Sequence, residues 1–231
     1  MLHLNNLTLT QATFRLQADW SAPQGQTVAI IGPSGAGKST LLMAIAGFLA
    51  PSAGRILWGG QDLAAVAPGQ RPISILFQDQ NLFPHLTIAR NLGLGLNPRL
   101  RLSVAEWAQV DAVLDRVGLG GMGNRRPAEL SGGQQGRAAL ARALLRAKPL
   151  LLLDEPFAAL GPALKADMLA LVSEVVTETR ATLLMVTHDP DDARRHAALT
   201  VVVDGGTAHP PQPTADLFAN PTPELRAYLG Q

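Results

Sequence analysis

The chain has 231 residues, 47% of them hydrophobic and 16% charged, with a net charge of +1. Such a chain can bury a core and does not have a disordered composition. The near-neutral charge argues against broad electrostatic binding of nucleic acid, and the absence of cysteine excludes disulfides and thiolate metal sites. The N-terminus lacks the pattern of a signal peptide, and no apolar run approaches the roughly 18 residues of a spanning helix. Membrane association is therefore expected only through a partner.

Three strands are predicted close together near the N-terminus, at 2–9, 14–20 and 27–31. Their spacing favours a small antiparallel element that precedes a main sheet. The third strand leads directly into a glycine-rich stretch. Beyond it, apolar residues recur at helical spacing from Leu41 to Leu49, so the glycine loop joins a strand to a helix.

The remaining elements alternate between strands and helices, which predicts an α/β fold with a mostly parallel sheet. Helical periodicity dominates from roughly 79 to 148, and this segment is interpreted as a helical subdomain inserted into a single domain spanning 1–231. A proline-rich turn at 209–213 precedes a short terminal helix. Buried strands are predicted at 73–77, 150–153, 182–186 and 199–203, and helices at 104–117 and 134–145.

The glycine stretch matches the phosphate-binding pattern G-x-x-x-x-G-K-[ST] between a strand and a helix. Glycines let backbone N–H groups converge on phosphate oxygens, and the helix directs its positive end at the same charge. Lys38 would reach the β- and γ-phosphates of ATP, and the Ser39 hydroxyl would bind Mg²⁺. A glycine turn without ligand is the alternative, which the strand–loop–helix context disfavours. The predicted loop comprises Gly32, Pro33, Ser34, Gly35, Ala36, Gly37, Lys38, Ser39 and Thr40.

An apolar strand at 150–153 ends in two adjacent acids, Asp154 and Glu155. At the carboxyl edge of a parallel sheet, Asp154 would face the Mg²⁺ shell. Glu155 would orient or deprotonate the water that attacks the γ-phosphate. The alternative is a solvated strand end whose acids cap a turn.

A second helix start with the properties of an anion site lies at Ser131, Gly132, Gly133 and Gln134. The serine is a good N-cap, the glycines expose N–H groups, and the helix end is positive. Alone, this pattern indicates an N-cap and nothing more. Its position between the two preceding motifs makes it specific.

The order of these motifs, with Leu130–Gln134 reading LSGGQ, resembles the ATPase cassettes of ABC transporters, which have a P-loop NTPase core. The resemblance implies that Gln78 contacts Mg²⁺ and water and that His188 contacts the γ-phosphate. In that family two cassettes pair head to tail, so the Ser131 loop closes on ATP held by the Lys38 loop of a second copy. Catalysis would then depend on dimerisation.

The resemblance covers the whole chain and is greatest to the ATP-binding subunits of ABC importers of the thiamine type, at 76–87, 91–98 and 181–186. It implies that ATP hydrolysis drives uptake of thiamine and its phosphates. The partners would be a transmembrane permease and, indirectly, a periplasmic solute-binding protein, at the cytoplasmic face of the inner membrane. The chain ends at Gln231 without the regulatory barrel of many relatives. Iron, polyamine or molybdate import is an alternative, and a soluble non-transport ATPase is disfavoured by the single short cassette.

Four features depart from the family or stay open. Gly161 stands where the family has an aspartate that links the two sites, so coupling between them is expected to be looser. Gly136 either weakens its helix or permits closer packing. Phe14 belongs either to the core or to the adenine site. The apolar segment 82–86 either packs locally or forms a groove for a permease helix.

Overall fold

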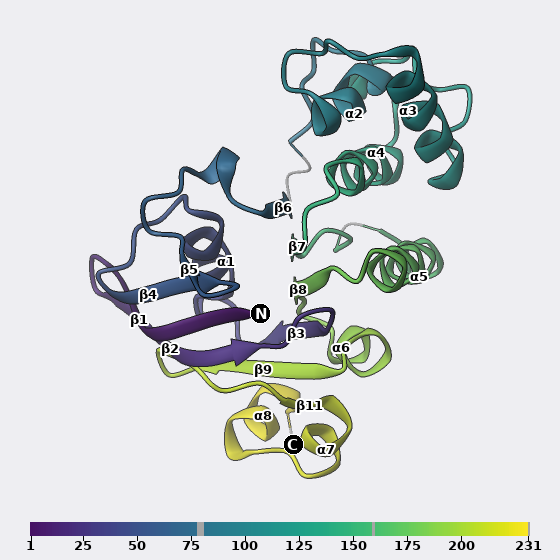
Figure 1. Ribbon diagram of the computed structural model, residues 1–231. Helices are drawn as coiled ribbons and strands as arrows, with labels where there is room; N and C mark the ends of the chain where they lie inside the picture. Colours follow the sequence, from purple (N-terminus) through teal and green to yellow (C-terminus); the bar gives the residue numbers. More distant parts are fainter. Residues whose placement is uncertain (78–80, 159, 231) are drawn as a thin grey trace. The chain divides into compact units, whose positions relative to one another are not determined.

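The computed structural model describes residues 1–77, 81–158 and 160–230 (Figure 1). The chain forms two compact units. The sheet unit comprises Met1–Ile73, Pro149–Asp154 and Val176–Gln231, and the helical unit comprises Ser74–Lys148 and Glu155–Val175. Each helix within the described ranges is too short or too polar to cross a membrane.

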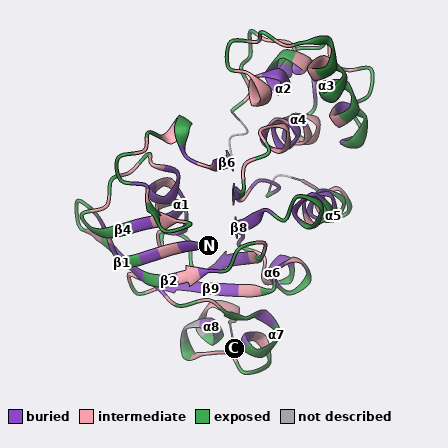
Figure 2. Cartoon of the chain, in the orientation of Figure 1, coloured by how far each residue is buried: buried purple, intermediate pink, exposed green. Residues whose placement is uncertain are grey.

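The N-terminal part of the sheet unit is antiparallel, as predicted. Strand β1 (Leu2–Gln11) pairs with β2 (Phe14–Ala22) on one side and with β4 (Ala53–Trp58) on the other, and β4 pairs with the short β5 (Gln61–Asp62). Buried and exposed residues alternate along β2, the pattern of a strand with one covered face (Figure 2).

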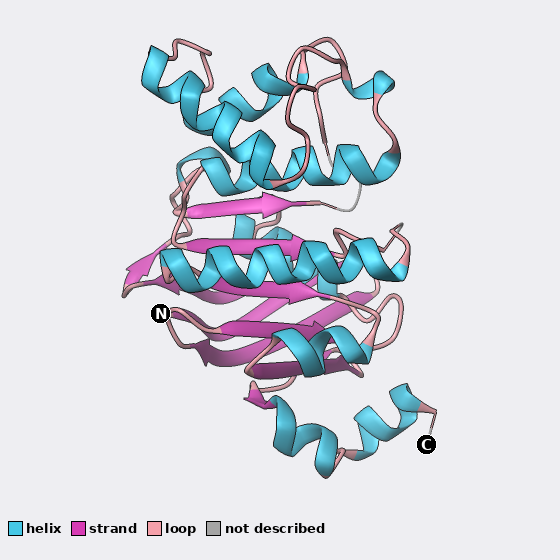
Figure 3. Cartoon of the chain, turned by 90° about the vertical axis from the view of Figure 1, so that its right-hand side faces the viewer, coloured by secondary structure: helices cyan, strands magenta, loops and turns pink. Residues whose placement is uncertain are grey.

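The second part of the sheet is parallel and forms the centre of the unit (Figure 3). Its order is β9 (Leu199–Asp204), β3 (Thr27–Ile31), β8 (Thr182–Val186) and β7 (Leu150–Asp154). The short β10 (Thr207–Ala208) joins β9 to β2 and so connects the two parts. The grouping of 27–31 with the antiparallel strands was wrong. Its neighbours along the chain are not its neighbours in the sheet, and its nearly complete burial is typical of a parallel strand.

The helices of the sheet unit follow its strands. Helix α1 (Lys38–Ala46) follows β3, and α6 (Pro190–His196) connects β8 to β9. After β11 (Gln212–Pro213) the chain ends in two short helices, α7 (Thr214–Ala219) and α8 (Pro223–Leu229), where one was predicted. A single-turn helix also lies at Pro68–Gln70.

The helical unit contains α2 (Ile88–Leu96), α3 (Val104–Arg116) and α4 (Gly132–Leu145), and a single turn at Pro127–Glu129. Strand β6 (Ile73–Leu76) and helix α5 (Pro162–Thr179) lie across the boundaries between the units. The predicted helices at 104–117 and 134–145 are confirmed as α3 and α4 with small shifts at their ends. The sequence patterns did not identify α2, because its glycines weaken the helical signal. Gly95 is needed for packing, since a Cβ at this position would lie 2.5 Å from the Arg142 carbonyl oxygen of α4.

Candidate nucleotide-binding site

Three predicted segments meet at one edge of the parallel sheet in the sheet unit. The glycine loop follows β3, His188 follows β8, and Asp154 ends β7. These strands are parallel neighbours in the order β3, β8, β7, so their carboxyl ends lie at the same edge. Ligands of open α/β sheets bind outside this edge.

The glycine loop passes close to the aromatic ring of Phe14. Gly37 is the N-cap of α1 with φ 101°, and a Cβ built on it would lie 2.4 Å from Phe14 Cζ. A side chain at this position would be strained in its backbone and would collide with the ring. Phe14 is half-buried against the loop, and a contact between its ring and adenine stays a prediction.

Lys38 begins α1 and is buried, with 7% of its surface exposed. Its Nζ donates hydrogen bonds to the carbonyl oxygens of Gly32 at 2.8 Å and Pro33 at 2.9 Å. The side chain therefore lies along the loop, and its ammonium group is held at the same sheet edge as the loop's glycines. A cation in this position suits the β- and γ-phosphates of a nucleotide.

The next residue of α1 joins this loop to β7. Ser39 Oγ donates a hydrogen bond of 2.9 Å to Asp154 Oδ1, and Asp154 is only 9% exposed. A hydroxyl and a carboxylate oxygen are hard donors, and Mg²⁺ in phosphate sites uses one or two protein carboxylates together with waters and phosphate oxygens. The two side chains therefore fit an Mg²⁺ site. In the part of the chain that the structure describes, no group of three or more His, Cys, Asp or Glu forms a separate metal cluster.

Glu155 has an uncommon backbone conformation for a residue with a side chain. Its φ is 45°, in the left-handed region, and the residue is half-buried. Such a conformation costs on the order of 1–3 kcal/mol and persists only where the surrounding structure imposes it. The turn is closed by a hydrogen bond from Ala158 N to the Glu155 carbonyl oxygen at 3.3 Å. The strain makes Glu155 a candidate functional residue independently of its sequence motif.

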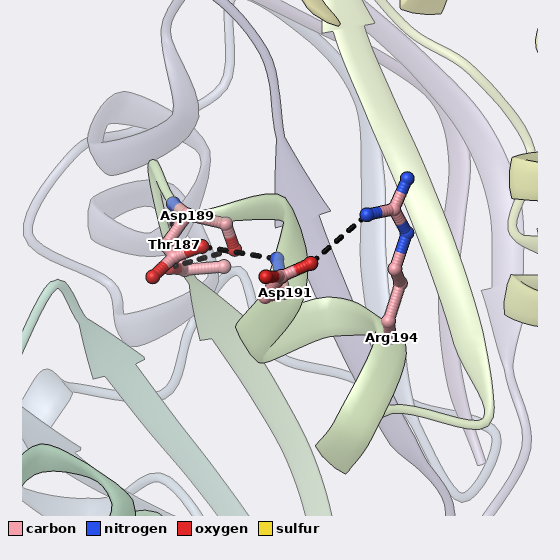
Figure 4. A network of polar contacts seen from close by, with 4 residues as sticks. All are labelled: Thr187, Asp189, Asp191 and Arg194. Atoms are coloured by element: carbon pink, nitrogen blue, oxygen red, sulfur yellow. Dashed lines mark hydrogen bonds and ion pairs between the residues drawn. The ribbon is translucent and has the colours of Figure 1, made fainter. Parts of the chain in front are cut away.

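His188 is exposed just after β8 and lies between Thr187 and Asp189, two members of a polar network that continues to Asp191 and Arg194 of α6 (Figure 4). Thr187 Oγ1 donates to Asp192 Oδ2 at 2.6 Å and accepts from Asp189 N at 3.1 Å. The Asp189 carboxylate accepts from Asp191 N at 3.0 Å and so caps α6. The loop before and after His188 is therefore fixed by its own side chains. The sequence patterns did not identify Thr187 and Asp192, because their contact depends on the start of α6.

In the helical unit, the predicted anion site is the N-terminus of α4. Ser131 Oγ accepts from Gln134 N at 3.3 Å, and Gln134 Oε1 accepts from Ser131 N at 2.9 Å, which is a capping box. A Cβ at Gly133 would lie 2.9 Å from Leu164 Cδ2, whereas Gly132 has open space around it. The burial of Gly136 within α4 favours close packing over a weakened helix.

Gln78 lies outside the described residues. The loop at 83–87 is held by Asn91, a fully buried residue of α2 that the sequence patterns missed. Asn91 Oδ1 accepts from Phe83 N at 2.7 Å, and its Nδ2 donates to the carbonyl oxygens of Phe83, Leu86 and Thr87. The fixed loop leaves Phe83 46% exposed.

Arg142 supports the same loop from α4. Its Nη1 donates to the Asn81 carbonyl oxygen at 2.8 Å, and its guanidinium carbon lies 5.9 Å from the centre of the Phe83 ring. Burial lowers the pKa of the Arg142 guanidinium, and the neighbouring Arg146 lowers it further. Both interpretations of segment 82–86 stay predictions: the Phe83 ring packs locally against Arg142 and His85, and Phe83 remains 46% exposed.

Comparison with known families identifies the class of protein. Residues 16–158 match the family model of the ABC transporter. The chain belongs to the ABC transporter family. It is the subunit type that binds and hydrolyses ATP in such a transporter. The α/β fold predicted for it, with an ABC-type P-loop NTPase core, is confirmed.

The particular relatives are more specific. The chain is 66% identical over 230 residues to the thiamine import ATP-binding protein ThiQ of Cereibacter sphaeroides, with complete coverage of both chains. It is 57% identical to the protein of the same name from a Ruegeria species over 230 residues, again with complete coverage. It is 50% identical over 217 residues to that of Yersinia pestis, covering 94% of this chain and 92% of the relative.

Solved structures of dimeric ATP-binding cassettes are also similar. One is a post-hydrolysis state bound to ADP and Pi, and another is described as a bacterial ABC transporter cassette. Each matches with a TM-score of 0.82 and 28% identity, covering 93% of this chain and 99% of the other.

Proposed function

We propose that this chain is the ATP-hydrolysing subunit of an importer of thiamine and its phosphates. The observation that carries ATP hydrolysis is the Ser39–Asp154 hydrogen bond beside the loop that holds Lys38. The assignment of the solute rests on the names of relatives that match the full length of the chain at up to 66% identity. Importers of iron, polyamines or molybdate remain the alternative for the solute.

Residues of the sheet unit bind the phosphates, and Gln78 of the helical unit joins them at the metal. The loop from Gly32 to Thr40 supplies backbone N–H groups, and Lys38 pairs with the β- and γ-phosphates. Ser39 and Asp154, with Gln78, would hold Mg²⁺, which when bound neutralises phosphate charge.

Glu155 and His188 act on the reacting groups. Glu155 orients the attacking water and accepts its proton, because phosphoryl transfer depends on positioning and charge stabilisation more than on covalent catalysis. His188 contacts the γ-phosphate from the end of β8. The strained φ of Glu155 and the exposure of His188 support these roles.

A second copy of the chain completes the site. Ser131, Gly132, Gly133 and Gln134 of one copy would close on ATP bound to the other, with the positive end of α4 directed at phosphate. The dimeric state of the similar cassettes supports a homodimer, for which we propose the head-to-tail arrangement. Opening and closing of this dimer would drive the transporter.

The partner in the membrane is a permease, contacted through the loop that Asn91 fixes and that exposes Phe83. The chain then lies peripherally at the cytoplasmic face of the inner membrane and depends indirectly on a periplasmic solute-binding protein. We include in the proposal that 1–231 form one ATP-binding domain, with an inserted helical subdomain at roughly 79–148.

Two substitutions test the ATPase assignment. Glu155→Gln should bind ATP with unchanged affinity, lose turnover and accumulate an ATP-bound dimer in size-exclusion chromatography. Lys38→Ala should lose nucleotide affinity, measured by calorimetry. Wild-type turnover in the first variant, or wild-type affinity in the second, would contradict the residue roles.

The solute is tested in the assembled transporter. The permease and binding protein are co-purified through a tag on this chain and reconstituted in liposomes. Thiamine-loaded binding protein should stimulate ATP hydrolysis several-fold over the unloaded form. Stimulation by an iron-, polyamine- or molybdate-loaded binding protein instead would refute the thiamine assignment and leave the ATPase assignment intact.

A further inference from the structure

The C-terminal helices of the sheet unit are anchored to the elements that carry the nucleotide site. Leu217 of α7 and Leu225 of α8 belong to one buried cluster. Its other members come from β3, which leads into the glycine loop, from α6 and its C-cap residue, and from β9: Ala29, Ile31, Ala193, Ala197 and Val202. Figure 1 shows α7 and α8 as a pair of short yellow helices at the C-terminus. The C-terminal segment therefore has a defined position against α6.

This anchoring places one hydroxyl at the loop of the proposed γ-phosphate histidine. Tyr228 of α8 is half-buried beside the cluster, and its Oη donates a hydrogen bond of 2.7 Å to the backbone carbonyl oxygen of His188. The two residues are 40 positions apart in sequence. The bond reaches the backbone of His188 itself, so it constrains the start of the imidazole side chain.

The other side of the same loop is fixed through α6. Asp189 caps α6, and Asp191 forms an ion pair of 2.9 Å with Arg194 (Figure 4). The Arg194 guanidinium in turn lies 4.5 Å from the centre of the Phe218 ring of α7. The loop is therefore held at the residues after His188 by α6 and α7, and at His188 by Tyr228.

We propose that Tyr228 is a positioning residue for catalysis, because its hydroxyl fixes the backbone of His188 and so sets where the exposed imidazole meets the γ-phosphate. The inference rests on the role of His188 in the proposed function. A hydrogen bond at a half-buried hydroxyl contributes little to folding, but small displacements of a catalytic group reduce turnover strongly. Loss of the Tyr228 hydroxyl should therefore affect turnover and not stability.

The test compares Tyr228→Phe with the wild type in the reconstituted transporter. The substitution keeps the ring and its packing and removes only the hydroxyl. We expect kcat for ATP to fall about three- to tenfold, with KM for ATP and the melting temperature unchanged. Thr222→Val is the matched control, since it also removes a hydroxyl, one that accepts from Leu225 N at 3.3 Å at the start of the same helix. The control should keep wild-type kcat.

A double substitution separates a path through His188 from any other effect. In a His188→Ala background, Tyr228→Phe should cause no further loss of rate in single-turnover assays. A wild-type kcat in Tyr228→Phe, or an equal further loss in the His188→Ala background, overturns the inference and leaves the proposed function intact. A fully active His188→Ala protein would refute the role of His188 and with it both claims.

Discussion

Arg71 stabilises the helix that carries Lys38, and its removal gives the sharpest stability prediction. The side chain is 5% exposed and donates four hydrogen bonds to backbone carbonyl oxygens. Two of these acceptors, the carbonyl oxygens of Ala44 and Ile45, lie in the C-terminal turn of α1, and that of Ala44 also accepts from Gly47 N at 3.0 Å. The other two acceptors are the carbonyl oxygens of Leu63 and Val66. Burial lowers the pKa of the guanidinium, and the Asp62 carboxylate opposes the shift.

The magnitude follows from these contacts. Hydrogen bonds from a charged donor contribute about 1.5–3 kcal/mol each, so four amount to about 6–12 kcal/mol. Withdrawing the guanidinium from water costs several kcal/mol and offsets much of this. We therefore expect Arg71→Met to lower the free energy of unfolding by about 3 kcal/mol. For a chain of this size, that corresponds to a melting temperature lower by about 6–12 °C.

Urea denaturation followed by tryptophan fluorescence measures this loss, since Trp20 is buried in the same unit. Arg55→Met is the matched control, because Arg55 is 69% exposed and its ion pair with Asp62 is 4.0 Å long, so a loss below about 1 kcal/mol is expected. A loss below about 1 kcal/mol in Arg71→Met as well would refute the claim that the hydrogen bonds of Arg71 stabilise α1.

Three further substitutions follow from the structure. Gly37→Ala should lower the free energy of unfolding by about 2–3 kcal/mol and abolish ATP binding. If the loss of stability comes from a clash with the Phe14 ring, it should be smaller in a Phe14→Leu background. An equal loss in both backgrounds would rule the clash out. Asn91→Leu should cost about 2–3 kcal/mol and weaken co-purification with the permease. The control is Asn97→Ala, because Asn97 is half-buried and its side chain bonds to residues 99 and 101 instead of to this loop, so it should leave co-purification unchanged. Unchanged co-purification of Asn91→Leu at reduced stability would remove the loop from the docking surface. Gly161→Asp should leave the melting temperature unchanged or raise it slightly, since open space surrounds Gly161. It should raise the Hill coefficient of ATP hydrolysis, because an aspartate at this position would link the two ATP sites. An unchanged Hill coefficient would show that coupling between the two sites does not depend on this position.

The sequence by itself determined the local parts of the site. The G-x-x-x-x-G-K-[ST] pattern placed the loop between β3 and α1, and the apolar run at 150–153 placed Asp154 at a strand end. Ser131 was identified as a helix start, and it forms a capping box there. Each of these features depends on residues within a few positions of one another, so periodicity and capping patterns in the sequence were sufficient to find them.

Only the tertiary structure decided which distant residues meet. The order of the parallel strands brought Ser39 to Asp154, 115 positions away, and moved 27–31 from the antiparallel group to the centre of the sheet. The contacts of Arg71 with the end of α1 and of Tyr228 with His188 likewise join separate elements. Local patterns carry no information about strand order or about which helix end lies near which loop, because these depend on how all the apolar faces are buried together.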